Sequence, residues 1–160
     1  MKYFMFAFLT VSAFSFCNSS CAKEEGTSFQ NNGTDVNNEI SDTTGNKMKM
    51  TVGTREFTVS LSDNATVKNF KTMLPLEIVM EDLNSNEKYF YFSNQLPTSS
   101  APGGNIQSGD LMLYSNNCLV LFYENFNTSY SYTRLGKADN INGLKSALGA
   151  GSVKVKFELQ

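Results

Sequence analysis

Two strong strand signals lie back to back in residues 109–123, which read GDLMLYSNNCLVLFY. The first is an alternating stretch that ends at Tyr114, and a Ser-Asn-Asn triplet with turn chemistry follows it. The second, residues 118–123, is continuously apolar, whereas a strand with one exposed face would alternate in polarity. The sequence therefore predicts a central hairpin whose second strand is covered on both faces by other parts of the chain.

The composition limits what such a chain can do. Its 160 residues fit one domain, 41% of them are hydrophobic, and the formal charge of −2 gives no reason to expect a nucleic-acid partner. Histidine is absent, so Ser-His or Cys-His catalysis and most zinc sites are excluded. We expect no cofactor and no metal site.

The first twenty residues have the pattern of a secretory signal peptide. Lys2 precedes an apolar stretch at residues 3–16, which is too short to span a bilayer. The small residues Ser19 and Ser20 lie directly before Cys21, as a lipoprotein signal peptidase requires. The sequence predicts lipid attachment at Cys21, although Asn18 departs from the usual pattern and cleavage after Ala22 is the alternative.

The residues around this cysteine resemble a bacterial lipoprotein signal. Residues 21–25, Cys-Ala-Lys-Glu-Glu, are similar to the surface-export signal of Bacteroidetes-type lipoproteins. The resemblance implies a cell-envelope protein, anchored by lipid at the outer membrane and exposed on the surface. Cleavage after Ala22 would instead give a soluble periplasmic or secreted protein.

The mature chain divides into a spacer and a domain. Residues 21–47 are rich in polar and small residues and cannot bury enough apolar surface to offset the entropy of ordering, so they predict a flexible tether. Residues 48–160 contain the strand and helix signals and predict one folded domain. No disulfide framework is expected, and Cys118, inside an apolar strand, is interpreted as a small core residue.

About eight strands are expected in this domain, because alternating or continuously apolar stretches recur between turn signals. Two short amphipathic helices should close the openings of a barrel: residues 65–74, capped by Asp63 or Asn64, and residues 141–148, capped by Asn140. Residues 95–108 and 124–131 are expected to be loops. The predicted strands are residues 49–52, 55–61, 76–82, 88–92, 111–114, 118–123, 132–137 and 153–159.

The order of these elements resembles the bacterial cyclophilin-like family over residues 48–160. The matching segments are residues 109–114, the apolar strand 118–123, and Leu135-Gly136-Lys137 with the helix and the final strand, 152–158, that follow. The resemblance implies an all-β fold, a closed barrel of about eight strands with two short capping helices.

Cyclophilins proper are peptidyl-prolyl isomerases whose catalytic arginine lies upstream of the central hairpin. Here the corresponding residues 88–108 contain no arginine, and the chain has only Arg55 and Arg134. We therefore expect a non-catalytic binding module of an exported lipoprotein rather than an enzyme. An isomerase with an atypical active site and a purely structural envelope protein are the alternatives.

The candidate ligand-binding residues follow the central hairpin. Tyr130, Tyr132 and Arg134 alternate along a strand, so their side chains should share one face, near Tyr123 and Phe126. Aromatic rings beside a fixed positive charge could bind a carboxylate or a sugar face. The predicted partner is an unknown small molecule or peptide; the alternative is a rim of packed tyrosines with Arg134 in a surface ion pair.

Overall fold

The computed structural model describes residues 45–160, which form nine β-strands and two short helices. The predicted all-β fold is confirmed. The signal peptide, most of the tether (residues 21–44) and Cys21 lie outside the described residues. The elements are β1 Lys47–Val52, β2 Arg55–Leu61, α1 Ala65–Lys71, β3 Leu76–Leu83, β4 Glu87–Tyr91, β5 Ala101–Ile106, β6 Asp110–Tyr114, β7 Cys118–Phe122, β8 Phe126–Ala138, α2 Leu144–Leu148 and β9 Val153–Leu159.

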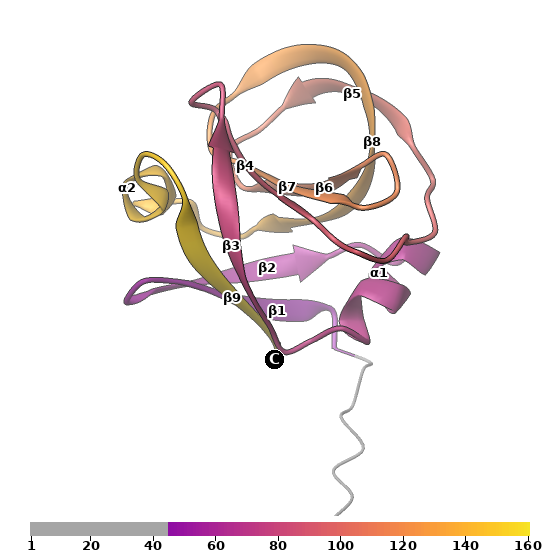
Figure 1. The fold of residues 1–160 in the computed structure, drawn as a ribbon, viewed down its shortest axis with the longest axis horizontal. Coiled ribbons are helices and arrows are strands. Elements are labelled where there is room, and N and C mark those ends of the chain that lie inside the picture. Colours follow the sequence, from indigo (N-terminus) through magenta and orange to yellow (C-terminus); the bar gives the residue numbers. More distant parts are fainter. Residues whose placement is uncertain (1–44) are drawn as a thin grey trace, which may run out of the picture. The chain divides into compact units, whose positions relative to one another are not determined.

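Eight of the strands close into a ring. Their order is β2-β1-β9-β3-β4-β7-β6-β8, and a further antiparallel pairing joins β8 back to β2 (Figure 1). The ninth strand, β5, pairs with β8 outside the ring (Figure 1). The ring has the predicted count of about eight strands, and β5 is a further strand that was not predicted.

The ring encloses the main hydrophobic core. Strand residues such as Met50 and Phe157 are fully buried there, because alternate residues of each strand point inward. Helix α1 adds Val67 and Phe70 to this core, and α2 adds Leu144 and Leu148. Both helices therefore complete the interior, as their amphipathic patterns predicted.

Strand β7 is buried on both faces, as its unbroken apolar sequence predicted. Leu119 and Leu121 belong to the core inside the ring. Cys118, Val120 and Phe122 belong to a second, smaller cluster on the opposite face. This outer cluster is completed by Ile106 of β5, Met112 of β6 and Tyr132 of β8. Figure 1 shows β8 curving with β5 into an arch beside β6 and β7.

Two segments predicted as loops form strands. Within residues 95–108, β5 pairs with the first half of β8, so residues 126–131 are also strand rather than loop. Strand β5 was not predicted because its Pro-Gly-Gly sequence does not favour a strand. Proline has no backbone N–H to donate to the hydrogen-bond ladder of a sheet. Proline is tolerated here because β5 lies at a sheet edge, and a register shift lies between Pro102 and Gly104.

Both helices are shorter than predicted. Helix α1 is capped by the Asn64 side chain, which accepts a hydrogen bond from the Val67 amide, but it ends at Lys71. Helix α2 begins at Leu144, three residues later than predicted, and Asn140 caps the turn before it by accepting from the Asn142 amide. Gly149 terminates α2. Neither helix in residues 45–160 is long and apolar enough to cross a membrane.

Candidate functional site

A cavity of about 600 Å³ opens over the outer cluster, on the face of β4, β7, β6 and β8 that points away from the main core. We call this cavity the aromatic groove, because five tyrosines and a phenylalanine line it. The lining residues are Leu83, Asn84, Asn86, Glu87, Tyr89, Tyr91, Tyr114, Cys118, Val120, Phe126, Asn127, Thr128, Tyr130 and Tyr132.

Strand register brings four of these side chains into one row. Tyr91 of β4 is paired with Cys118 of β7, Cys118 with Tyr114 of β6, and Tyr114 with Tyr132 of β8. Directly opposed residues on neighbouring strands have their side chains on the same face of a sheet. The row therefore places a small thiol between larger rings, and the cavity lies over it.

The rings around the groove contact one another, edge to face in the pairs Tyr114–Tyr130 and Tyr89–Tyr91 and tilted in the pair Tyr114–Tyr132. Tyr114 lies 6.0 Å from Tyr130 and 5.6 Å from Tyr132 between ring centroids, and Tyr89 lies 5.8 Å from Tyr91. These separations are in the range where aromatic pairs stabilise each other. The tyrosines are therefore held as two contacting sets, one from β4 and one from β6 and β8.

The groove collects most of the exposed large apolar surface. Within residues 45–160, six large apolar side chains are exposed: Val79, Leu83, Tyr91, Tyr114, Tyr130 and Ile141. Four of these six, Leu83, Tyr91, Tyr114 and Tyr130, line the aromatic groove. Single exposed apolar residues are ordinary, but their concentration around one concavity indicates a binding surface.

Polar residues reach the groove from the turn between β3 and β4, from the start of β4, and from Asn127 and Thr128 of β8. Asn84 and Ser85 adopt left-handed backbone conformations, with φ of 54° and 56°, as a tight hairpin turn requires. The next residues, Asn86 and Glu87, line the groove, and burial raises the pKa of the Glu87 carboxyl. The Oδ1 atom of Asn86 is buried and has no hydrogen-bond partner among the described residues.

The thiol in the groove is not activated. Cys118 is buried, and desolvation raises its pKa, with a smaller opposing effect from a hydrogen bond with Tyr91. A thiol with a raised pKa is a poor nucleophile at neutral pH. The prediction that Cys118 is a buried core residue is confirmed, and the residue also contributes to the floor of the groove.

The structure distributes the predicted site residues over three cavities. Phe126, Tyr130 and Tyr132 line the aromatic groove. Tyr123 lines a separate cavity of about 800 Å³, where its hydroxyl donates to Asp82 and its pKa rises to about 12, mainly through burial. Arg134 and Tyr132 line a third, smaller cavity. The five predicted residues therefore do not form one site, because Tyr123 and Arg134 line different cavities and neither lines the aromatic groove.

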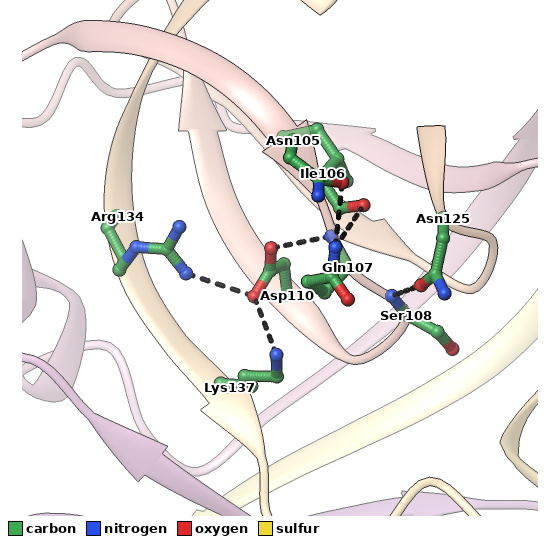
Figure 2. A network of polar contacts seen from close by, with 8 residues as sticks. All are labelled: Asn105, Ile106, Gln107, Ser108, Asp110, Asn125, Arg134 and Lys137. Carbon is green, nitrogen blue, oxygen red and sulfur yellow. Dashed lines mark hydrogen bonds and ion pairs between the residues drawn. The ribbon is translucent and has the colours of Figure 1, made fainter. Parts of the chain in front are cut away.

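Arg134 is engaged in a polar network rather than in the aromatic groove. Its Nη1 atom lies 2.9 Å from Oδ1 of Asp110, a carboxylate that is only 1% exposed (Figure 2). Asp110 also accepts a hydrogen bond from the Gln107 amide and lies 3.8 Å from Nζ of Lys137 (Figure 2). The ion pair expected as the alternative for Arg134 is therefore present, with a buried partner.

The other arginine, Arg55, does not line the groove either. The Nη2 atom of Arg55 donates to the Asn142 carbonyl, and its guanidinium lies 5.8 Å from the Phe57 ring centroid. Neither arginine of the chain lines the aromatic groove. Within residues 45–160, no group of three acidic, cysteine or histidine side chains is arranged to hold a metal ion.

Sequence reasoning missed three tyrosines and the acidic residue of the groove. Tyr89 and Tyr91 alternate along β4, and Glu87 begins the same face, which is a signal that the sequence contains. Tyr114 ends the alternating stretch of the central hairpin. Their assembly into one site depends on the pairing of β4 with β7 and of β6 with β8, and these pairings are not local in sequence.

The comparisons with known proteins agree with this architecture. The solution structure of the hypothetical protein AF2241 from Archaeoglobus fulgidus is similar, with a TM-score of 0.53 and 18% identity, over 72% of this chain and 95% of that one. A search of curated proteins found no match. The model of the Cyclophilin-like family matches residues 50–158. The chain belongs to the cyclophilin-like family.

Proposed function

We propose that this domain is a non-catalytic binding module and that the aromatic groove is its ligand-binding surface. The observation that carries the proposal is the gathering of four of the six exposed large apolar side chains of residues 45–160 around one cavity. An apolar concavity with a few convergent polar groups is the usual form of a ligand site. Glu87, Asn127 and Thr128 provide such polar groups in the lining.

The groove favours a ligand with an apolar body. Its volume of about 600 Å³ suits a small molecule or the side chains of a short peptide. The rings of Tyr114 and Tyr130 offer flat surfaces that need little ordering when a ligand stacks on them, because each ring already contacts the other.

The alternative, prolyl isomerisation, receives less support. An isomerase must hold a charged donor against the twisting prolyl amide, where it stabilises the transition state more than the ground state. Arg134 is paired with Asp110, and Arg55 donates to a backbone carbonyl. With neither guanidinium in the lining of the groove, binding without catalysis is the better proposal.

We also propose that the domain is held at the cell envelope by lipid on Cys21, with the spacer of residues 21–47 between anchor and domain. The support is the small pair Ser19-Ser20 before the cysteine and the polar composition that follows it. Intact mass of the membrane fraction should show acyl chains on Cys21, and Cys21→Ser should release the protein. An unmodified soluble chain beginning at Lys23 would contradict the anchor.

A titration of the isotope-labelled full chain with 2-phenylethanol, a neutral aromatic probe, tests the groove. We expect amide shifts to concentrate on β4, β6 and β8, and Tyr114→Ala and Tyr130→Ala to weaken binding by about tenfold each, since each removes a stacking surface. Val79→Ala is the matched control, because Val79 is exposed but does not line the groove. Shifts that avoid the groove would contradict its role.

A prolyl-peptide assay tests the alternative. The wild-type chain should show no isomerisation above the uncatalysed rate. A measurable rate that disappears in Arg134→Ala or in Arg55→Ala would overturn the non-catalytic assignment.

A further inference from the structure

The lining of the aromatic groove is acidic and contains no basic residue. Of its fourteen lining residues, Glu87 carries the one formal charge. A second carboxylate, that of Glu81, lies at the edge, where Oε2 accepts a hydrogen bond of 2.7 Å from the Tyr89 hydroxyl. An anionic ligand would meet repulsion here, whereas a cation would meet complementary charge.

The Glu87 carboxylate is the unpaired charge of the lining, and it differs in accessibility from the unpaired oxygen of Asn86. The Oδ1 atom of Asn86 is buried without a hydrogen-bond partner in residues 45–160. The neighbouring Glu87 carboxylate is half-buried and makes no hydrogen bond or ion pair with any described side chain or backbone group. The Asn86 oxygen has almost no accessible surface and is closed to a ligand, so the unpaired, half-buried Glu87 carboxylate is the group of the lining to which a donor in the groove would bind.

The tyrosine rings strengthen the case for a positive charge. The described cation–ring contacts of the protein involve Phe57 and Tyr123, neither of which lines the groove, so the faces of Tyr89, Tyr91, Tyr114 and Tyr130 are without a cation from the described part of the chain. Aromatic faces attract ammonium groups through the ring quadrupole, most strongly where water is excluded.

We propose that the aromatic groove binds the protonated amino group of a small primary amine, with the ammonium donating to the Glu87 carboxylate while the apolar body lies among the tyrosines. A primary ammonium has three N–H donors, and a hydrogen bond from a cation to a carboxylate is stronger than one between neutral groups. The inference rests on the proposed function, because it assigns a chemical class to the ligand of the same groove.

Three probes with one aromatic body and different head groups test the inference. Phenethylamine is protonated at pH 7, 2-phenylethanol is neutral and phenylacetate is negative. Each is titrated into the full chain and followed by calorimetry and by amide shifts. We expect phenethylamine to bind about tenfold more tightly than 2-phenylethanol, since a desolvated cation–ring contact and a charged hydrogen bond each exceed their neutral counterparts. Phenylacetate should bind more weakly than either.

Variants separate the charge from the cavity. Glu87→Gln keeps the shape and removes the charge, so it should weaken phenethylamine about tenfold and leave 2-phenylethanol unchanged. Glu56→Gln is the matched control, because Glu56 is an exposed carboxylate on β2 that lines a different cavity. Melting temperatures of the variants confirm that they fold.

The outcomes distinguish the two proposals. Equal binding of amine and alcohol, tightest binding of phenylacetate, or an unaffected Glu87→Gln variant would overturn the amine assignment while the groove stands as a binding surface. Absence of groove shifts with all three probes would overturn the groove itself. Binding of a lysine-containing peptide but not of phenethylamine would show that the occupant is a peptide side chain rather than a small amine.

Discussion

The Nζ atom of Lys88 lies 2.5 Å from Oδ2 of Asp82, and the lysine side chain is completely buried. The same ammonium donates to the carbonyls of Gly149, at 2.8 Å, and Gly151, at 2.6 Å. Asp82 also accepts from the Tyr123 hydroxyl at 2.8 Å. One buried charge therefore connects the β3–β4 hairpin with the segment between α2 and β9.

Replacing Lys88 with methionine should destabilise the fold strongly. The substitution keeps the length of the side chain but leaves the Asp82 carboxylate and two carbonyls without their donor. Removing one partner of a buried ion pair costs about 3–5 kcal/mol, so the free energy of unfolding in urea should fall by that order. Lys154→Met is the control, since Lys154 is exposed and its partner Glu77 is too. Its effect should stay within about 0.5 kcal/mol, and equal effects of both variants would contradict the role of Lys88.

Stability should decrease in acid through Asp82. Hydrogen bonds from Lys88 and then from Tyr123 hold the pKa of Asp82 below its ordinary value of 3.8. Below that value the unfolded chain takes up a proton that the folded chain does not, so the contribution is present above about pH 4 and is lost as pH falls through the folded pKa.

Urea denaturation at a series of pH values checks this. Asp82→Asn should be less stable at neutral pH and should lose less of its remaining stability on acidification than the wild type does. Asp63→Asn, at an exposed carboxylate, should follow the wild-type profile. A profile of Asp82→Asn parallel to the wild type would contradict the linkage.

The Asp110–Arg134 pair should be asymmetric in energy. Asp110 is buried and holds the Gln107 amide as well as the guanidinium, whereas the Arg134 side chain is 51% exposed. Asp110→Ala should therefore cost about 2–3 kcal/mol, since it leaves a buried amide unsatisfied, and Arg134→Ala about 1 kcal/mol. A double-mutant cycle measures the coupling, and an Arg134→Ala cost above that of Asp110→Ala would contradict the assignment.

Gly136→Ala should loosen the closure of the ring. Gly136 is paired with Leu61, and a Cβ atom there would lie 2.5 Å from the Ser60 carbonyl oxygen, a backbone atom that cannot move alone. Overpacking of this kind costs about 1–3 kcal/mol. Hydrogen exchange should become faster at the β2–β8 ladder, while Ser129→Ala, at an exposed position of β8, should leave it unchanged. Unaltered protection in Gly136→Ala would contradict the predicted clash.

The strands of the ring could be predicted from the sequence because their apolar residues either alternate with polar ones or form an unbroken run. The alternation of β9, with Val155 and Phe157 buried, and the unbroken apolar sequence of β7 both translate directly into burial. Likewise, the Asn64 cap of α1 follows from its own side-chain chemistry. These features are local, and local rules describe them.

Strand β5 and the start of β8 could not be predicted by the same rules. Neither Pro102-Gly103-Gly104 nor residues 126–131, where Asn, Thr and Ser separate two aromatic residues, gives a clear strand signal alone, and the two segments pair with each other. The same holds for the site. Alternation along β8 identified Tyr130 and Tyr132, but their association with Tyr91 and Glu87 requires the strand order across the sheet.

The two-sided burial of β7 also limits where the groove that we propose as a ligand-binding surface can vary among relatives of this protein. A change of size at Val120 would disturb the outer cluster, and the neighbouring Leu119 and Leu121 are fixed by the interior of the ring. Tyr91, Tyr114 and Tyr130 are exposed, so substitutions there avoid that penalty. We therefore expect substitutions that change ligand preference to occur at Tyr91, Tyr114 and Tyr130 rather than at Val120.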